Sequence, residues 1–405
     1  MGEGTALIDA SSRPWLARAL SPARLGPRTL RNRIIKTATY EGMTPGGLPS
    51  PALIEHHREL ARGGVGMTTV AYCAVSPHGR TFPEQMYMRE EAVPLLARLV
   101  EAVHEHGAAA SLQLGHCGFF SRNTELPRRT SLGPSPMLNQ YGLLSGVPFS
   151  RAMTRADIDS TAREFADAAE RAVRAGFDAV ELHFGHGYLL SQFLSPATNH
   201  RRDEYGGSLA GRLRFPLLVL ERVRERVGDR CAVIAKTNLR DGFRGGLEID
   251  EAVEICAALA QGGIDAIELT GGFTSRTPFY LFRGKAPLAE MIQAEKSRMQ
   301  RLALRLFGRK VVREYPFEEM YFLDMARRVR AAVNVPLVLL GGIVSAANLE
   351  KAMADGFDFV AMGRALIADP DLIARIEAGT AERSRCVACN KCVAESDRGG
   401  VRCVL

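Results

Sequence analysis

The stretch D-A-V-E-L-H-F-G-H-G-Y-L-L-S-Q-F-L-S-P-A-T-N-H-R-R-D-E-Y-G-G, residues 178–207, decides how the rest of the chain is interpreted. It begins within an apolar run that is typical of a parallel strand buried on both faces. The run ends at Gly185 and Gly187, where we expect the strand to pass into a loop. Three polar side chains lie in that break: His183, His186 and Tyr188. Imidazole and phenol groups can hydrogen-bond a substrate oxygen and transfer a proton, which is acid chemistry without a metal.

Eight short apolar runs alternate with amphipathic segments along the chain. We expect strands at 33–40, 65–73, 108–115, 177–184, 231–239, 264–271, 335–342 and 357–366. We expect helices at 51–62, 93–106, 155–175, 209–227, 248–261, 317–333, 345–355 and 370–378. Eight such units favour an α/β fold, a (β/α)8 TIM barrel. The alternative, an open doubly wound sheet, would be expected to carry a Gly-x-Gly-x-x-Gly turn after an early strand, and none is present.

Two connections are too long to be simple turns, one after the third strand and one after the sixth. Both leave the C-terminal ends of strands, where barrel enzymes build their sites. We interpret residues 1–405 as one domain in which 273–316 is a basic insertion and 386–403 a cysteine-rich tail. The insertion holds ten basic residues against three glutamates. Apolar residues near helical spacing indicate an amphipathic helix, which is a mobile lid, a docking surface or a solvated helix packed on the barrel.

The bulk properties limit the class of protein. A hydrophobic content of 46% is ordinary for a globular protein, and a net charge of +7 gives no stripe for nucleic acid. No apolar run is long enough to span a membrane, and Asp9 and Arg13 interrupt any signal peptide. Four of the eight cysteines are in the last twenty residues, so they are not a spread-out disulfide framework. We expect a cytoplasmic protein that binds a small molecule. The sequence leaves open whether the protein forms a homo-oligomer.

Chemically useful residues also end other expected strands. Gln113 carries an amide that can donate and accept, although a glutamine that ties down a loop is an equal alternative. Lys236 places a charge at the end of an apolar strand, so it should face an anion, because an unpaired buried ammonium is costly. The alternative is an ion pair between Lys236 and a neighbouring carboxylate.

Two strand ends carry groups that suit a phosphate. Gly341 and Gly342 end the seventh expected strand, and Gly363 and Arg364 lie in the eighth. Glycine lets backbone N–H groups approach an anion, and arginine adds charge and a forked donor. Barrels often bind phosphate at these two strand ends, although glycine at such junctions is also common for steric reasons alone.

The chain resembles the old yellow enzyme family of FMN-dependent NADH:flavin oxidoreductases and ene-reductases. The motifs that carry the resemblance are H-x-x-H-x-Y, L-L-S-Q-F-L-S-P-A-T-N, R-x-D-E-Y-G-G, N-R-I-I-K-T-A-T-Y-E-G and M-G-R-A-L-I-A-D-P-D-L. The resemblance covers nearly the whole chain except the insertion. It implies an FMN-binding barrel that takes hydride from NAD(P)H and reduces an enone-like alkene conjugated to a carbonyl.

The resemblance also implies roles for individual residues. His183 and His186 would hold the carbonyl oxygen, and Tyr188 would deliver the proton. Lys236 would lie near flavin N1, and Tyr40 stands where the family commonly has threonine or cysteine beside the flavin carbonyl. The implied cofactor-binding residues are Thr37, Ala38, Tyr40, Gln113, Lys236, Gly341, Gly342, Gly363 and Arg364.

The tail contains Cys386, Cys389, Cys392 and Cys403. This spacing suits a [4Fe-4S] cluster or zinc, and unligated thiols are the third alternative. The motif resembles that of the dienoyl-CoA reductase and trimethylamine dehydrogenase branch, with one residue fewer between the second and third cysteines. We expect this chain to lack the extra flavin domain of that branch.

Two other functions stay open on the sequence. The first is a flavin-dependent dehydrogenase that oxidises C–H or C–N bonds and passes electrons out through a tail cluster. The second is a metal-dependent barrel hydrolase or lyase with His183 and His186 on a metal and no flavin.

Overall fold

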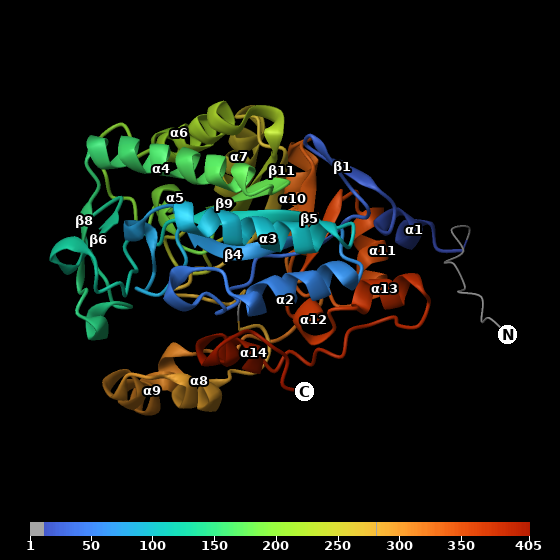
Figure 1. Cartoon of the computed structure of the whole chain (residues 1–405). Helices are drawn as coiled ribbons and strands as arrows, with labels where there is room; N and C mark the ends of the chain where they lie inside the picture. Colours follow the sequence, from blue (N-terminus) through green and yellow to red (C-terminus); the bar gives the residue numbers. More distant parts are fainter. Residues whose placement is uncertain (1–11, 281) are drawn as a thin grey trace.

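Eight parallel strands close into a barrel in a computed structural model that describes residues 12–280 and 282–405 (Figure 1). The strands are β3 (Ile34–Lys36), β4 (Met67–Ala74), β5 (Ala109–Gly115), β9 (Ala179–Phe184), β10 (Ala232–Asn238), β11 (Ala266–Thr270), β12 (Leu337–Leu339) and β13 (Phe359–Met362). They follow the chain order around the barrel, and pairing of β13 with β3 closes it. The expected TIM barrel is therefore confirmed.

Helices cover the outside of the barrel because each buries one apolar face against the strands. They are α2 (Pro51–Arg62), α3 (Val93–His104), α4 (Arg155–Arg174), α6 (Leu209–Val227), α7 (Ile249–Gln261), α10 (Leu323–Ala332), α11 (Ala346–Ala354) and α13 (Leu372–Glu377). A capping box between Thr154 and Asp157 starts α4. The expected start of a helix at 317 was wrong, because Met320 has a positive φ of 53° that a helix does not tolerate.

The remaining elements lie at the two ends of the barrel and on its flank. They are α1 (Pro14–Ala19), β1 (Ala23–Leu25), β2 (Arg28–Leu30), β6 (Thr130–Gly133), β7 (Met137–Leu138), β8 (Phe149–Ala152), α5 (Leu189–Leu194), α8 (Leu288–Ala294), α9 (Arg298–Val311), α12 (Arg364–Ala368) and α14 (Lys391–Glu395). The long connection after the third barrel strand contains the small sheet β6–β8–β7. The expected eighth strand ended too late, because β13 stops at Met362 and α12 begins two residues later.

The side chains inside the barrel change from apolar to charged along the strands. The apolar layer is formed by residues such as Ile35, Met67, Ala179, Ile234, Val338 and Phe359. Inward-facing positions recur every second residue along a strand, so the residues two positions further on form the next layer inside the barrel. It contains Thr37, Glu181, Lys236 and Glu268, all of them buried. This charged layer forms the floor of the site described below.

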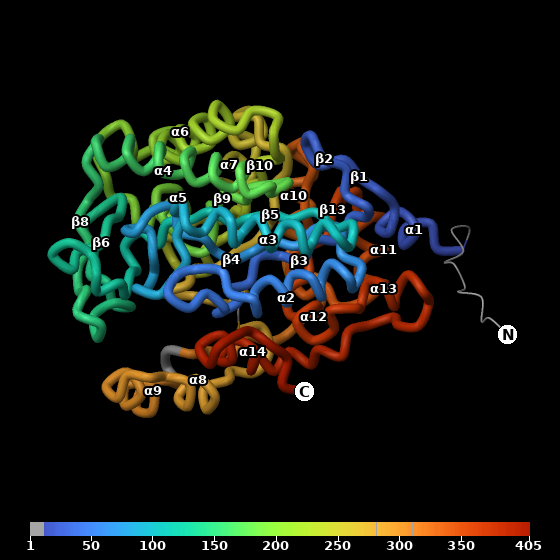
Figure 2. The backbone as a smooth tube through the Cα atoms, in the orientation of Figure 1, coloured from blue at the N-terminus to red at the C-terminus, as the bar shows by residue number. Residues whose placement is uncertain are grey.

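The basic insertion and the cysteine-rich tail lie against each other on one side of the barrel (Figures 1 and 2). The Lys391 ammonium is 3.1 Å from a Glu290 carboxylate oxygen, and the Asn390 amide donates to the Lys285 carbonyl at 2.8 Å. The amphipathic helix expected in the insertion is confirmed as α9, which follows the shorter α8. Leu302 and Leu306 of α9 are exposed. The assignment of residues 1–405 to one domain stays a prediction, and residues 1–11 and 281 lie outside the described part.

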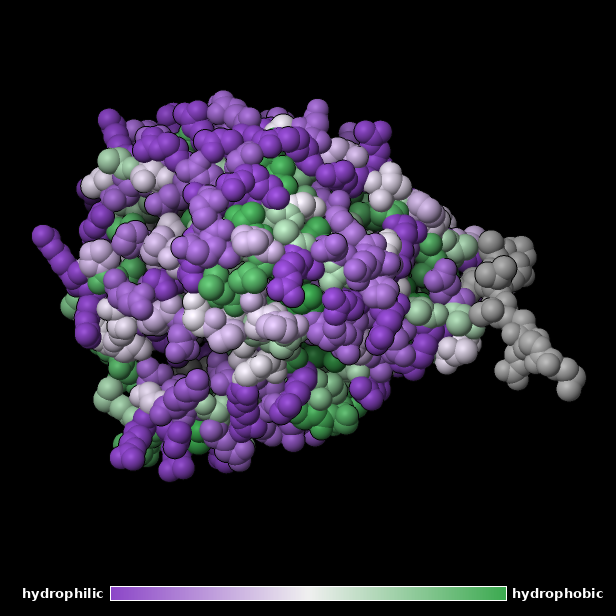
Figure 3. All heavy atoms as spheres, in the orientation of Figure 1, coloured by the Kyte–Doolittle hydropathy of each residue, from purple (hydrophilic) through white to green (hydrophobic). Residues whose placement is uncertain are grey.

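The visible face in Figure 3 is covered mainly by hydrophilic side chains, with separate small apolar areas. Over the described ranges 12–280 and 282–405, no helix combines the length and apolar character needed to cross a bilayer.

Candidate active site

One cavity of about 290 Å³ opens at the carboxyl ends of the barrel strands, near the lower end of the ~300–1,000 Å³ typical of ligand pockets. The cavity brings together every residue that the sequence indicated for catalysis or flavin binding. These are Thr37, Ala38, Tyr40, Gln113, His183, His186, Tyr188, Lys236, Gly341, Gly342, Gly363 and Arg364. They come from six different strand ends, which meet here because parallel strands present their carboxyl ends at one edge.

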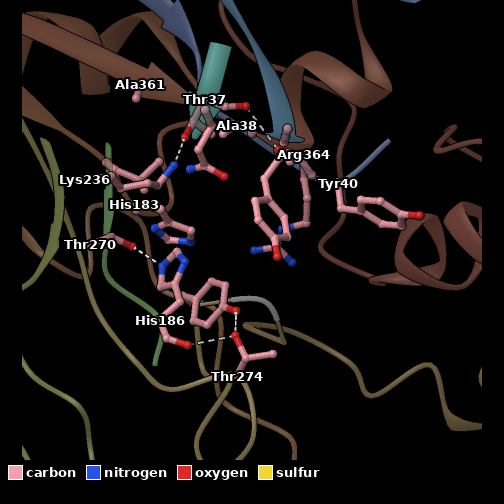
Figure 4. A pocket seen from close by; sticks show the side chains of 18 of the residues that line it. Thr37, Ala38, Tyr40, His183, His186, Lys236, Thr270, Thr274, Ala361 and Arg364 are labelled. Carbon is pink, nitrogen blue, oxygen red and sulfur yellow. Dashed lines mark hydrogen bonds between the residues drawn. The ribbon is translucent and has the colours of Figure 1, made fainter. Parts of the chain in front are cut away.

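Two histidines and a tyrosine stand together on one wall of the cavity, and Figure 4 labels the two histidines. The ring centres of His183 and Tyr188 are 4.3 Å apart, and those of His183 and His186 are 5.1 Å apart. His183 Nδ1 is buried and has no hydrogen-bond partner in the described part of the chain. The Tyr188 hydroxyl likewise makes no hydrogen bond to any residue that the structure describes. His183 Nδ1 and the Tyr188 hydroxyl are therefore both available to hydrogen-bond a ligand on this wall.

Burial fixes the protonation states of these groups. It lowers the pKa of His183 and of His186 well below the ordinary value, with Lys236 acting in the same direction. It raises the pKa of Tyr188 well above the ordinary value. Both imidazoles are therefore neutral and the phenol is protonated across the physiological pH range. In these states each of the three side chains can donate a hydrogen.

A turn and a threonine set the direction of the His186 ring. His186 has a left-handed φ of 57°, and its backbone N–H donates to the Asn238 side chain at 2.9 Å. Nε2 of the ring is 2.8 Å from the Thr270 hydroxyl at the end of β11. Gly187 continues the turn with a φ of 74°, where a Cβ would lie 2.4 Å from the Phe273 ring. The polar break quoted from the sequence is therefore a tight turn with no room for a side chain at Gly187.

Aromatic residues that the sequence did not indicate complete this wall. Tyr280 stacks face to face on His186 with ring centres 3.6 Å apart, and its hydroxyl lies 2.8 Å from that of Thr274. Tyr72 and Phe120 contact Tyr188 edge-on at 4.9 and 5.0 Å. Tyr280 belongs to the insertion, which matched no motif, so only its aromatic character could have indicated it.

The charged layer forms the floor of the cavity. Lys236 Nζ is 2.7 Å from a Glu268 carboxylate oxygen and 3.8 Å from Glu181, and it donates to the Thr37 hydroxyl at 2.6 Å. The Gln113 amide donates to Glu181 at 2.6 Å. The ion pair with a carboxylate, which was the alternative for Lys236, is therefore present. Sequence reasoning missed Glu181 and Glu268, although both stand at inward positions of otherwise apolar strands.

Another part of the cavity lining carries the glycines and Arg364. Gly341 and Gly342 have positive φ values of 107° and 73°, which other residues rarely adopt. Arg364 donates to the Asn390 side chain in the tail and to the Arg283 carbonyl. In Figure 4 the Tyr40 side chain is directed away from His183 and His186. Its ring packs edge-on against Phe82 at 5.5 Å.

These features fit a flavin mononucleotide. A polar floor offers donors and acceptors to a ring edge, an aromatic wall suits a flat ligand, and Arg364 with the glycines suits a phosphate. Together, the barrel and this cavity fit the class of flavin-dependent oxidoreductases. Within that class, the chain belongs to the NADH:flavin oxidoreductase / NADH oxidase family, the old yellow enzyme family, whose model matches residues 20–272. It is an oxidoreductase that uses FMN and NADH or NADPH. The hydrolase or lyase alternative is thereby rejected.

Three similar proteins show the range of the family. The chain is 46% identical to 4,4'-dithiodibutanoate disulfide reductase of Rhodococcus erythropolis, with 95% of this chain and 94% of that protein covered. It is 30% identical to a multifunctional alkene reductase/demethylase of Caballeronia cordobensis, with 95% and 52% covered. A solved structure of a 2-naphthoyl-CoA reductase complex matches with a TM-score of 0.79 at 25% identity, with 95% and 56% covered. The chain thus spans about half the length of the last two proteins.

The four cysteines of the tail line one small cavity together with Asn390 and Arg364. Cys386 also lies on the wall of the large cavity, so the tail adjoins the candidate site at Arg364. Burial raises the pKa of the Cys386 thiol and raises that of Cys392 to about 11. In the described part of the chain, no group of three or more Cys, His, Asp or Glu side chains has a metal-binding arrangement. The four thiols suit iron–sulfur or zinc chemically, and binding would require the tail to tighten.

Replacement of Arg364 by alanine should weaken FMN binding. Loss of a charged hydrogen bond to phosphate costs about 1.5–3 kcal/mol, or roughly a ten- to hundredfold rise in the dissociation constant. R364K keeps the charge and should lose less affinity for FMN than R364A. Titration of the apoprotein with FMN, followed by flavin fluorescence, measures both constants. Equal affinities of R364A and the wild type would remove Arg364 from the phosphate site.

Metal analysis of anaerobically purified protein tests the tail. We expect iron together with acid-labile sulfide, because four thiolates on short spacings suit a [4Fe-4S] cluster. Zinc without sulfide would indicate a structural site instead. Four titratable thiols and no metal would show that the tail binds neither.

Proposed function

We propose that this oxidoreductase reduces the double bond of an alkene conjugated to a carbonyl group, with Tyr188 as the proton donor. The observation that carries the proposal is the wall on which neutral His183 and His186 adjoin a protonated Tyr188 whose hydroxyl has no partner among the described residues. FMN held by the residues of this cavity supplies the hydride that comes from NAD(P)H. One hydride and one proton together saturate the double bond.

The histidines would act on the carbonyl oxygen of the substrate. Negative charge develops on that oxygen as hydride arrives at the β-carbon, and fixed donors stabilise such charge without reorganising. Thr270 and Tyr280 hold the His186 ring from its edge and its face, so its direction is set before the substrate binds. Because both imidazoles are neutral, they donate hydrogen bonds and do not compete with Tyr188 as acids.

Tyr188 would deliver the proton to the α-carbon. Its pKa is raised by burial, so the hydroxyl keeps its proton until carbanion character develops beside it. Tyr72 and Phe120 pack on its ring and limit its motion. The apolar rings would also exclude water and hold an enone-like substrate flat against the flavin.

A disulfide is the second candidate acceptor. It is favoured by the 46% identity to a disulfide reductase over nearly the whole of both chains. Two electrons and two protons convert one disulfide into two thiols, so the same site could serve with Tyr188 protonating a departing sulfur. The two acceptors differ in what the histidines bind, since a disulfide has no carbonyl oxygen.

Replacement of Tyr188 by phenylalanine should leave flavin reduction by NAD(P)H nearly unchanged and slow reoxidation by an enone. General acids typically contribute a factor of about 10²–10⁴, and we expect a loss in that range. Stopped-flow absorbance of the flavin separates the two half-reactions. Y72F is the matched control, because the Tyr72 hydroxyl donates to the Gly79 carbonyl and not to a ligand. An unchanged rate with 2-cyclohexenone in Y188F would contradict the assignment.

The same experiment compares the two acceptors. Reduced wild-type protein is mixed with 2-cyclohexenone or with 4,4'-dithiodibutanoate, and the rates of flavin reoxidation are recorded. Faster reoxidation by the enone supports the first candidate, and reoxidation by the disulfide alone supports the second.

A further inference from the structure

The floor of the cavity holds an ion pair between Lys236 and Glu268, and the glutamate has no assigned role. Lys236 and Glu268 are register partners on neighbouring strands β10 and β11, and both side chains are almost completely buried. Their charged atoms are 2.7 Å apart. The Thr37 hydroxyl joins them, because it accepts from Lys236 at 2.6 Å and donates to Glu268 at 2.5 Å. The three side chains thus hold one another in a single arrangement.

A second carboxyl group borders this pair. Glu181 lies 3.8 Å from Lys236 and accepts from the Gln113 amide. Burial raises the pKa of Glu181 to about 8, so at neutral pH it is largely protonated. Burial alone would lower the pKa of Lys236, but Glu181 and Glu268 together raise it above the ordinary value. The layer therefore gathers two carboxyl groups around the Lys236 ammonium.

We propose that Glu268 is a positioning residue that aims Lys236 at the flavin and offsets its charge, and thereby sets the reduction potential of the bound FMN. The proposal rests on the placement of FMN against Lys236 in the proposed site. A buried positive charge beside a flavin favours the reduced form, which carries more negative charge than the oxidised form. An anion 2.7 Å from that charge cancels much of its field.

Both buried glutamates of the charged layer thereby gain a role. A buried ion pair is weak evidence for stability, since apolar residues of similar size are often at least as stabilising. A site that must reduce an acceptor benefits from a flavin whose potential is not raised too far by an uncompensated lysine. Glu181 adds a reserve, because it can lose its proton if Glu268 no longer carries a charge.

The experiment measures the reduction potential of FMN in the loaded protein at pH 7, by equilibrium with a reference dye. Glu268→Gln removes the carboxylate 2.7 Å from the ammonium and should shift the potential to more positive values, by less than the double variant because Glu181 can then lose its proton. Glu181→Gln should leave it near the wild-type value, because that carboxyl is already protonated. The double variant should show the full shift, at least a tenfold change in the ratio of reduced to oxidised flavin, which corresponds to about 30 mV.

Two reference variants make each outcome decisive. Lys236→Met removes the cation and should shift the potential to more negative values. Glu268→Asp keeps the charge but withdraws it from Lys236, so it should give a smaller positive shift. It takes the place of Glu268→Gln if that variant does not fold. A wild-type potential in the double variant, together with a shift in Lys236→Met, overturns the proposal and leaves the FMN placement intact. A wild-type potential in Lys236→Met contradicts the placement itself.

Discussion

The structure depends on a layer of buried charge at the carboxyl end of the barrel. Earlier along the strands the barrel interior is apolar. Beyond the charged layer, residues at the carboxyl ends of the strands line the cavity. Lys236 and Glu268 can be buried because they neutralise each other and because Thr37 satisfies both. The same contacts give the cavity a polar floor beneath aromatic walls, which is what a flavin ring with one polar edge requires.

The fold and most of the site could be predicted from the sequence. Short continuous apolar runs alternating with amphipathic helices define the barrel, and the carboxyl ends of parallel strands must meet at one edge. For that reason residues as distant in sequence as Thr37, Gln113 and Arg364 line one cavity. The errors lie at element ends. At Met320, for example, a positive φ prevents helical geometry until α10 begins at Leu323, and no glycine in the sequence signals it.

The parts that sequence reasoning missed depend on contacts between distant segments. Glu268 stands in an apolar strand, but its partner Lys236 belongs to another strand, so the ion pair is visible only in the folded chain. Tyr280 lies in an insertion without recognisable motifs, yet it stacks on His186. The tail meets the same site, because Cys386 lines the cavity and Asn390 binds Arg364. The insertion and the tail, which appear peripheral in the sequence, therefore border the chemistry.

The visible absorption spectrum of the purified protein, before and after anaerobic addition of NADH or NADPH, tests the central claim most directly. The site described here predicts a yellow protein with one FMN per chain, whose flavin band is bleached by at least one of the two nucleotides. A colourless protein that takes up no FMN, or a flavin band that neither nucleotide bleaches, would contradict the account.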